Sequence, residues 1–139
     1  MITENRWGVL YCPKHEGLSN PSKRWDKIEK ALHDNNVDYD FVQSENTKSV
    51  ERLVKMMINN GYKTIVIVGG DSALNDSVNC LMDVEKDVRD QICLGVIPNG
   101  LMNDFAHFWG FSESEYDQSI KWIKQRRVRK IDLGCIRYY

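Results

Sequence analysis

The sequence has no long apolar run, no excess of charge of one sign and few cysteines. Its longest uninterrupted apolar stretch, Ile65 to Val68, is far too short to cross a bilayer, and its polar start does not resemble a secretory signal. The 19 basic and 20 acidic residues leave a net charge of −1, which gives no electrostatic reason to expect nucleic acid as a partner. We therefore expect a cytoplasmic protein.

The cysteines and histidines show no metal-site pattern. The four cysteines form no C-x-x-C pair, and the three histidines have no spacing typical of ligands, so no metal site is predicted from the chain itself. Cys12 and Cys93 lie in apolar, strand-like stretches, where a buried free thiol is commoner than a disulfide. All four thiols are expected to be reduced.

The length of 139 residues is that of one domain, and 42% apolar with 28% charged residues is typical of a globular protein. Short apolar runs alternate with segments of helical period. Strands are predicted at residues 7–12, 37–41, 64–68, 92–97 and 131–138. Helices are predicted from Pro21 to the stop at Asn35-Asn36, across Val50–Ile58 with Gly61 as C-cap, from the turn at 69–71 through Leu81, across 105–109, and after a capping box of Ser112 and Glu115.

This alternation predicts an α/β fold: a three-layer open sheet, mostly parallel, with helices on both faces. The carboxyl ends of parallel strands meet at one edge of such a sheet, and ligands bind there. Two loops rich in glycine, asparagine and aspartate follow predicted strands at this edge. They are the main functional clue.

The first loop begins at Gly69-Gly70-Asp71 and continues to Asp76. Two glycines after a buried strand permit positive φ and close backbone approach, and a helix starting there offers N–H groups to an anion. The loop lacks G-K-[ST] and G-x-G-x-x-G, so it is neither a P-loop nor a dinucleotide fingerprint. Two interpretations remain open: a phosphate cradle, or a tight turn in which Asp71 caps the following helix.

The second loop runs from Pro98 to Phe105, again between a strand and a helix. Its structural interpretation is that Asn103 or Asp104 is the N-cap of the short helix. Its functional interpretation is that it shares a cleft with the first loop, because both follow strands at the same edge.

Together the loops resemble the diacylglycerol kinase catalytic-domain family, which includes bacterial lipid kinases and sphingosine kinases. That family has a G-G-D-G-T turn followed by L-N-E, and then a P-x-G-T-x-N-D-F-A loop. The matching residues are Gly69, Gly70, Asp71, Leu74, Asn75, Pro98, Gly100, Asn103, Asp104, Phe105 and Ala106, with Asp76 in place of the glutamate. Residues 11–14 resemble the family's N-P-x-S-G phosphate loop, and residues 131–134 its I-D-L-G strand. NAD kinases share the G-G-D turn, but the N-D-F-A run favours the lipid-kinase branch.

The resemblance implies an ATP-dependent lipid kinase that uses Mg²⁺ and phosphorylates a lipid hydroxyl such as that of diacylglycerol. Residues 1–139 would be its N-terminal nucleotide-binding domain. The family's second, β-rich domain, expected to supply most Mg²⁺ ligands and the general base, is absent from this chain. The chain alone is therefore expected to be inactive. Its lipid substrate implies transient contact with a membrane surface, and an apolar interface exposed by the missing domain could form a homodimer.

Site residues follow from the resemblance in the same way. Asp71 is the predicted catalytic residue, orienting a metal-bound phosphate or assisting proton removal from the lipid hydroxyl. Ser44 is included because it roughly matches a threonine that contacts nucleotide in relatives. The predicted nucleotide-binding residues are Cys12, Pro13, Lys14, Ser44, Gly69, Gly70, Asp71, Ser72, Ala73, Asn75, Gly100, Leu101, Asn103 and Asp104.

The sequence also departs from the family pattern. Ser72 and Ala73 replace glycine and threonine, Leu101 replaces the second threonine, and Cys12 replaces asparagine. A lost hydrogen bond to a charged phosphate costs roughly 1.5–3 kcal/mol, although backbone N–H donors survive these changes. The alternative hypothesis is a non-catalytic lipid- or nucleotide-binding relative with a degenerate ATP site; a kinase for a small molecule other than a lipid is a third.

Two surface features have a functional and a structural interpretation. The basic run from Lys124 to Lys130 is a solvated face or a dock for anionic lipid headgroups, with the solvated face favoured. The aromatic stretch from His107 to Phe111 is more often packing beneath a short helix than a lipid-binding surface.

Overall fold

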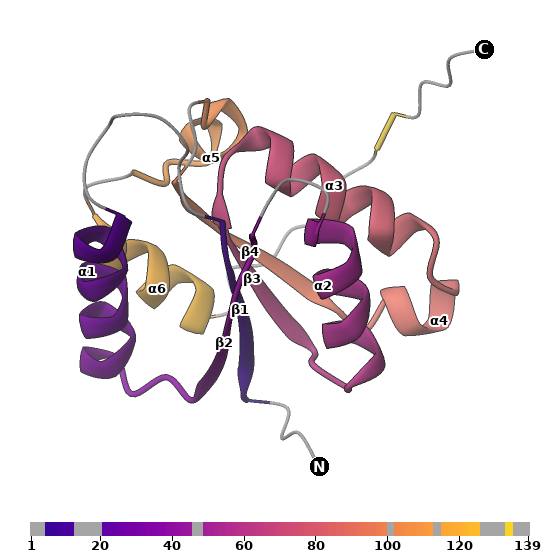
Figure 1. Cartoon of the computed structure of the whole chain (residues 1–139), viewed down its shortest axis with the longest axis horizontal. Coiled ribbons are helices and arrows are strands. Elements are labelled where there is room, and N and C mark those ends of the chain that lie inside the picture. Colours follow the sequence, from indigo (N-terminus) through magenta and orange to yellow (C-terminus); the bar gives the residue numbers. More distant parts are fainter. Residues whose placement is uncertain are drawn as a thin grey trace.

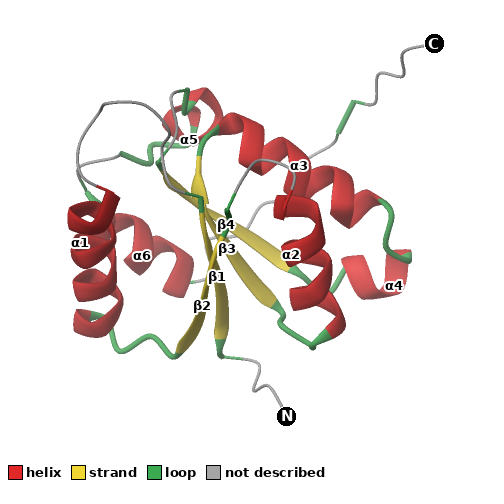
Figure 2. Cartoon of the chain, viewed as in Figure 1, coloured by secondary structure: helices red, strands yellow, loops and turns green. Residues whose placement is uncertain are grey.

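The computed structural model describes residues 5–12, 21–45, 49–99, 102–112, 115–125 and 133–134. Within them, strands and helices alternate along the chain (Figures 1 and 2). The strands are β1 (Trp7–Tyr11), β2 (Tyr39–Gln43), β3 (Thr64–Gly69) and β4 (Cys93–Pro98). The helices are α1 (Pro21–Asp34), α2 (Ser49–Asn59), α3 (Asp71–Met82), α4 (Lys86–Arg89), α5 (Asp104–Phe108) and α6 (Tyr116–Lys124). The strand expected at 131–138 lies outside the described residues, apart from 133–134, which are not in a strand.

The described strands form one parallel sheet in the order β2-β1-β3-β4. Trp7 is in register with Tyr39 on one side and Thr64 on the other, and Thr64 is in register with Cys93. Every residue of β3 is buried, as expected for a continuous apolar run covered on both faces. The predicted α/β fold is confirmed.

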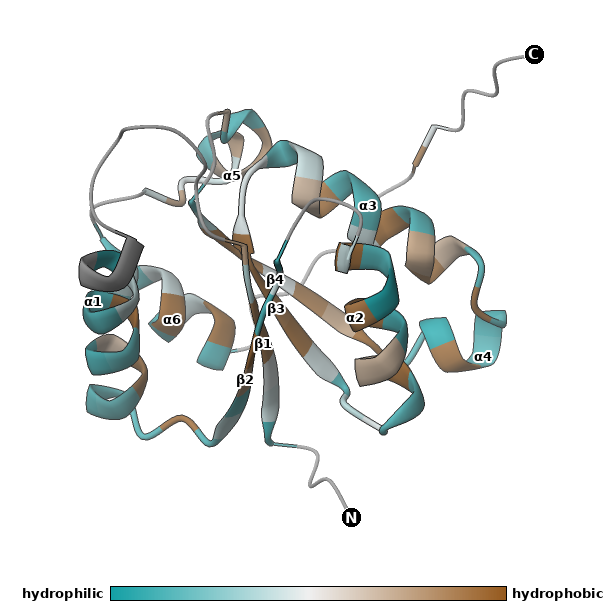
Figure 3. Cartoon of the chain, in the orientation of Figure 1, coloured by the Kyte–Doolittle hydropathy of each residue, from teal (hydrophilic) through white to brown (hydrophobic). Residues whose placement is uncertain are grey.

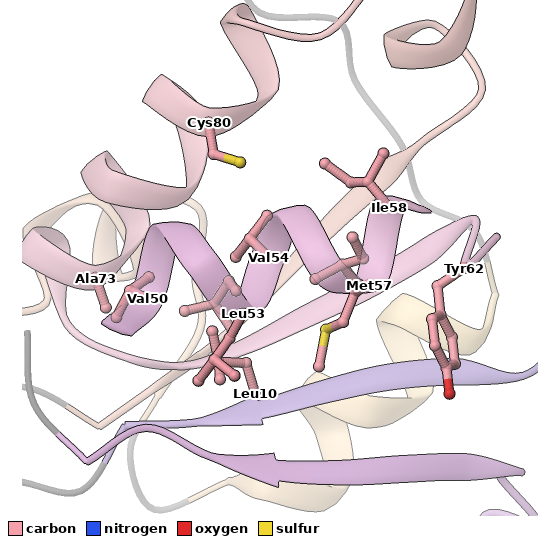
Figure 4. Packing of buried hydrophobic residues seen from close by; sticks show 11 residues of the cluster. Leu10, Val50, Leu53, Val54, Met57, Ile58, Tyr62, Ala73 and Cys80 are labelled. Atoms are coloured by element: carbon pink, nitrogen blue, oxygen red, sulfur yellow. The ribbon is translucent and has the colours of Figure 1, made fainter. Parts of the chain in front are cut away.

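Alternate side chains of the central strands enter two separate cores. On one face, Leu10, Ile65 and Ile67 pack against α2 and α3, where Val54 and Met57 are buried (Figure 4). On the other face, the second core contains Val9 and Tyr11 of β1, Val66 and Val68 of β3, Ile28 and Leu32 of α1, and Ile120 of α6. Burying one large aliphatic side chain contributes about 1.5–3 kcal/mol, so these two layers are the main source of stability. Figure 3 shows the apolar residues concentrated on the strands and on the helix faces turned toward them.

Several predicted helix ends are confirmed. Gly61 follows α2 with φ 94°, Gly110 follows α5 with φ 87°, and Asn36 follows α1 with φ 56°. The boundary of the second strand is wrong by two residues: Val37 donates its N–H to Leu32 O and so closes α1, and β2 begins only at Tyr39.

The predicted capping box is also wrong. The last helix begins at Tyr116 with Glu115 in the N-cap position, and the Glu115 side chain makes no capping hydrogen bond. The short helix α4 was not predicted, because its four residues include one apolar side chain, Val88, and therefore no helical period.

Candidate functional site

The carboxyl edge of the sheet contains a topological switch point between β1 and β3. The chain leaves β1 toward one edge of the sheet and leaves β3 toward the other, and α1 covers the opposite face from α2 and α3. In open parallel sheets, ligands bind in the crevice where strand order reverses in this way. Cys12 follows the end of β1 and Gly69 is the last residue of β3, so these two residues flank the switch point, and α1, α3 and α5 begin at this edge (Figure 1).

The glycines of the first loop serve close packing instead of positive φ. Gly69 is the last residue of β3, and Gly70 is the N-cap of α3 with φ −101° and ψ −167°, an extended conformation open to any residue. Gly70 therefore does not use the positive φ that glycine permits. Gly69 is needed for packing within the protein, because a Cβ placed on it would lie 3.0 Å from the Cβ of Ala73 and 3.2 Å from that of Cys12.

Asp71 joins the two candidate loops directly. Its backbone N–H donates to Met102 O at 2.9 Å. Its carboxylate accepts the N–H of Asp104 on Oδ2 at 2.9 Å and the N–H of Phe105 on Oδ1 at 3.1 Å. The G-G-D and N-D-F loops therefore lie side by side at the edge of the sheet.

Asn103 occupies the N-cap position of α5, as one interpretation of the second loop predicts, but the capping interpretation of Asp71 is wrong. Asp71 does not cap its own helix, α3, whose N-cap is Gly70 without a side-chain cap. It caps α5 instead, because α5 has Asn103 in the N-cap position and no capping bond from that side chain. A carboxylate beside the first N–H groups of a helix is electrostatically favourable, so one residue stabilises the starts of two helices.

Asn99 is a second link at this edge, and it was not among the predicted site residues. Its side chain is 1% exposed. Its N–H donates to Gly69 O at 2.9 Å, its Nδ2 donates to Cys12 O at 3.2 Å, and its Oδ1 accepts Nη1 of Arg24 at 2.8 Å. Asparagine is an ordinary residue in the turn after a strand, so its position alone did not mark it as part of the site. Arg24 lies 75 residues away and no sequence pattern connects the two.

The other predicted site residues of the two loops differ in their exposure to solvent. Ser72 and Asn75 are exposed on α3, whereas Ala73 is buried and packs beneath that helix. Asn103 is buried and Asp104 is exposed. Their proposed contacts with nucleotide stay predictions.

Ser44 is 3% exposed, and its hydroxyl lies 2.7 Å from that of Ser49. Its N–H donates to Tyr11 O, so it extends the link between β1 and β2 beside the crevice. A direct contact of this hydroxyl with nucleotide would require a local rearrangement. Pro13, Lys14, Gly100 and Leu101 lie outside the described residues.

Two groups on the α3 side of the edge, Asp76 and Cys12, have raised pKa values. Burial, and then the charge of Glu51, raise the pKa of Asp76 above its usual value. Burial, and then the charge of Asp76, raise the pKa of the Cys12 thiol to about 12. A raised pKa keeps the Cys12 thiol protonated, which disfavours a role as a thiolate nucleophile.

Among the described residues at the edge, the candidates for holding a metal ion are single carboxylates. Among the described residues, no group of three histidine, cysteine or acidic side chains is placed to hold a metal ion. Both oxygens of Asp71 already accept backbone N–H groups, while the Asp104 side chain is exposed. Mg²⁺ typically uses one or two carboxylates together with substrate phosphates, and the residues present fit that arrangement.

The surface near α5 exposes several large apolar side chains. Phe108 is 79% exposed and Met102 64%, while the Phe108 and Trp109 rings meet edge to face with centroids 5.1 Å apart. The packing interpretation of this aromatic stretch therefore holds only for part of it. Of the basic run, Lys124 is described: it donates to Asn35 O at the C-terminal end of α1, away from the crevice. No helix among the described residues is both long and apolar enough to span a bilayer.

Comparison with known proteins places this architecture among lipid kinases. Residues 7–136 match the diacylglycerol kinase catalytic domain. The chain is 27% identical over 137 residues to a Bacillus subtilis protein named "Putative lipid kinase YtlR", covering 96% of this chain and 42% of that protein. It is 31% identical over 103 residues to "Putative lipid kinase SERP0390" of Staphylococcus epidermidis, covering 71% of this chain and 32% of that protein.

A crystal structure from Bacillus anthracis, described as that of "a putative diacylglycerol kinase", superposes with a TM-score of 0.73 at 20% identity, covering 93% of this chain and 45% of that one. At this identity the similarity shows the shared fold. The chain thus spans less than half the length of these relatives.

Proposed function

Because the chain belongs to the diacylglycerol kinase catalytic domain family, we propose that it is the nucleotide-binding part of an ATP-dependent lipid kinase. The acceptor in this proposal is a lipid hydroxyl such as that of diacylglycerol. The observation that carries it is the Asp71 contact, because it joins the two family motifs at the carboxyl ends of β3 and β4, next to the switch point of the sheet. Since the chain spans 42% of the length of the Bacillus subtilis relative, little or no turnover is expected from it alone.

The proposed chemistry is phosphoryl transfer, which depends mainly on positioning and on neutralising charge. The N–H groups of a helix's first turn have no partner inside the helix, so those of Ser72 and Ala73 would donate to ATP phosphates. These donors are independent of the side chains that depart from the family pattern. Asp104 would contribute a carboxylate to Mg²⁺, which supplies charge neutralisation when bound.

Asp71 has two roles in this proposal. It was predicted as the catalytic residue, orienting a metal-bound phosphate or assisting proton removal. Its contacts support a positioning role as well, because the same carboxylate holds the backbone of Asp104 in place. A change at Asp71 would therefore alter both the chemistry and the shape of the site.

The proposal is tested by calorimetric titration of the purified protein with Mg-ATP. We expect saturable binding that weakens in Asp104→Asn and is unchanged in Asp87→Asn, an exposed acid in the first turn of α4. Failure to bind ATP at millimolar concentration would contradict the proposal. Transfer of the γ-phosphate to diacylglycerol in mixed micelles, by the protein together with the remainder of a full-length relative, tests the acceptor.

The alternative function is a non-catalytic relative with a degenerate ATP site. The buried Ala73 side chain favours it, because no hydroxyl is present where the family has threonine. Ala73→Thr separates the two: stronger ATP binding would indicate a degenerate site that the hydroxyl restores. Weaker binding would show a pocket adapted to alanine, since Ala73 already lies close to Gly69.

A further inference from the structure

We infer that Arg24 is a phosphate ligand of this site, its guanidinium held at the crevice by Asn99. The inference deepens the proposed nucleotide-binding function and rests on it. Nothing in the family motifs described above includes this residue. It follows from where the structure places a positive charge.

Arg24 lies in the first turns of α1, at the carboxyl edge of the sheet. Its Nη1 donates to Oδ1 of Asn99 at 2.8 Å, and Nδ2 of the same asparagine donates to Cys12 O at 3.2 Å. The backbone N–H of Asn99 donates to Gly69 O. Asn99 thereby holds the guanidinium near the ends of both β1 and β3, the two walls of the switch-point crevice.

The surroundings of the Tyr11 hydroxyl indicate the same location for the Arg24 guanidinium. Burial raises the pKa of Tyr11, while a hydrogen bond with Asn99 and the charge of Arg24 act in the opposite direction. Tyr11 is the last residue of β1 and is buried. The positive charge therefore lies beside the end of the strand that leads into the predicted phosphate loop.

The charge balance of the edge gives a protein cation a role in addition to that of the proposed Mg²⁺. Asp71, Asp76 and Asp104 all belong to the two loops on the α3 and α5 side. A cation that faced a nucleotide triphosphate from another side would offset the repulsion from these acidic side chains. Arg24 approaches from α1, on the opposite face of the sheet. A guanidinium is permanently charged and presents a planar fork that matches phosphate oxygens.

The competing interpretation is purely structural: Arg24 serves only to satisfy the buried oxygen of Asn99. An uncharged donor would do that equally well, so the two interpretations differ in the charge. Arg24→Gln keeps an N–H donor and removes the charge. Arg24→Lys keeps the charge and removes the fork. Arg89→Gln is the control, because it removes one arginine from α4, at the opposite end of the molecule (Figure 1).

The experiment is a calorimetric titration of the purified protein and the three variants with ATP and with inorganic tripolyphosphate, each at low and high salt. Circular dichroism and the urea midpoint of each variant confirm that it is folded. We expect Arg24→Gln to weaken binding of both ligands at least about tenfold, the loss expected for a charge-assisted hydrogen bond. Arg24→Lys should lose less affinity for both ligands, and Arg89→Gln should bind them as tightly as the unaltered protein does. The salt dependence should be smaller in Arg24→Gln, because one ion contact is missing.

The outcomes separate the inference from the proposed function. If the unaltered protein binds ATP and Arg24→Gln binds it as Arg89→Gln does, the inference is overturned and the function stands. If the protein binds tripolyphosphate in an Arg24-dependent way but not ATP, the inference stands and the nucleotide function is lost. Absence of binding to either ligand overturns both.

Discussion

Replacing Asp71 should loosen the contact between the two motif loops more than it destabilises the rest of the fold. Asp71→Ala removes the acceptors of two N–H groups at the start of α5, at 2.9 and 3.1 Å. Loss of a side-chain cap costs about 0.5–2 kcal/mol, and a carboxylate in the first turn of α3 contributes about 0.3–1 kcal/mol more. Both contacts are solvent-exposed, so water replaces them and the upper limits are not reached. We expect a total loss of about 2 kcal/mol.

The assay is urea unfolding combined with amide hydrogen exchange. Asp71→Asn retains one acceptor and should lose about half as much free energy of unfolding. In both variants the amides of Asp104 and Phe105 should exchange faster, while those of β3 change only in proportion to global stability. Asp87→Ala, a similar exposed acid in the first turn of α4, is the control and should stay within about 0.5 kcal/mol.

The reasoning would be refuted by either of two results. One is an Asp71→Ala protein no less stable than Asp87→Ala. The other is unchanged exchange at Asp104 and Phe105, which would mean that the carboxylate does not hold the start of α5. A protein that keeps its stability but loses ATP binding in Asp71→Asn would instead support a chemical role for Asp71 alone.

Three further predictions concern Gly69, Asp40 and Cys12. Gly69→Ala should cost about 1–3 kcal/mol in urea unfolding, because its new Cβ would meet one neighbour at 3.0 Å; an unchanged midpoint would show that the loops relax freely. The Arg6 guanidinium lowers the pKa of Asp40 to about 2. The ion pair therefore stabilises the fold fully at pH values above 3.8, the ordinary pKa of aspartate, and this contribution is lost as the pH falls toward 2. Asp40 is 40% exposed, which limits the effect to about 1 kcal/mol, and Asp40→Asn should flatten the acid limb of the stability curve by that amount. Burial, and then Asp76, raise the pKa of Cys12 to about 12, so its alkylation by iodoacetamide at mildly alkaline pH should be much slower in the folded than in the unfolded protein; equal rates would contradict this.

The sequence predicted the layers of the fold because the signals involved are local. The apolar run of β3 and the helical stripe of α2 each lie within a dozen residues, and glycine or asparagine at positions 36, 61 and 110 ends each helix by its own backbone preference. The second strand was misplaced because Val37 fits an alternating pattern but is used by the C-terminal end of α1. Local periodicity cannot distinguish these uses.

The arrangement of the site was less accessible from sequence because its contacts are long-range. One of the two interpretations of the first loop has Asp71 capping the nearest helix, yet the partners of its carboxylate lie 33 and 34 residues along the chain. Asn99 was passed over because its role depends on Arg24 and Cys12, which only the folded sheet brings near it. Motifs identified which loops matter, and the fold was needed to show how they are joined.

The link between Asp71 and the start of α5 has a consequence for binding. A site assembled from separate mobile loops must order them when the ligand arrives, and that ordering weakens affinity. Here the carboxylate has already fixed the relative position of two segments on folding. A ligand that contacts either segment meets both in a preorganised geometry, so even a few backbone contacts yield useful affinity.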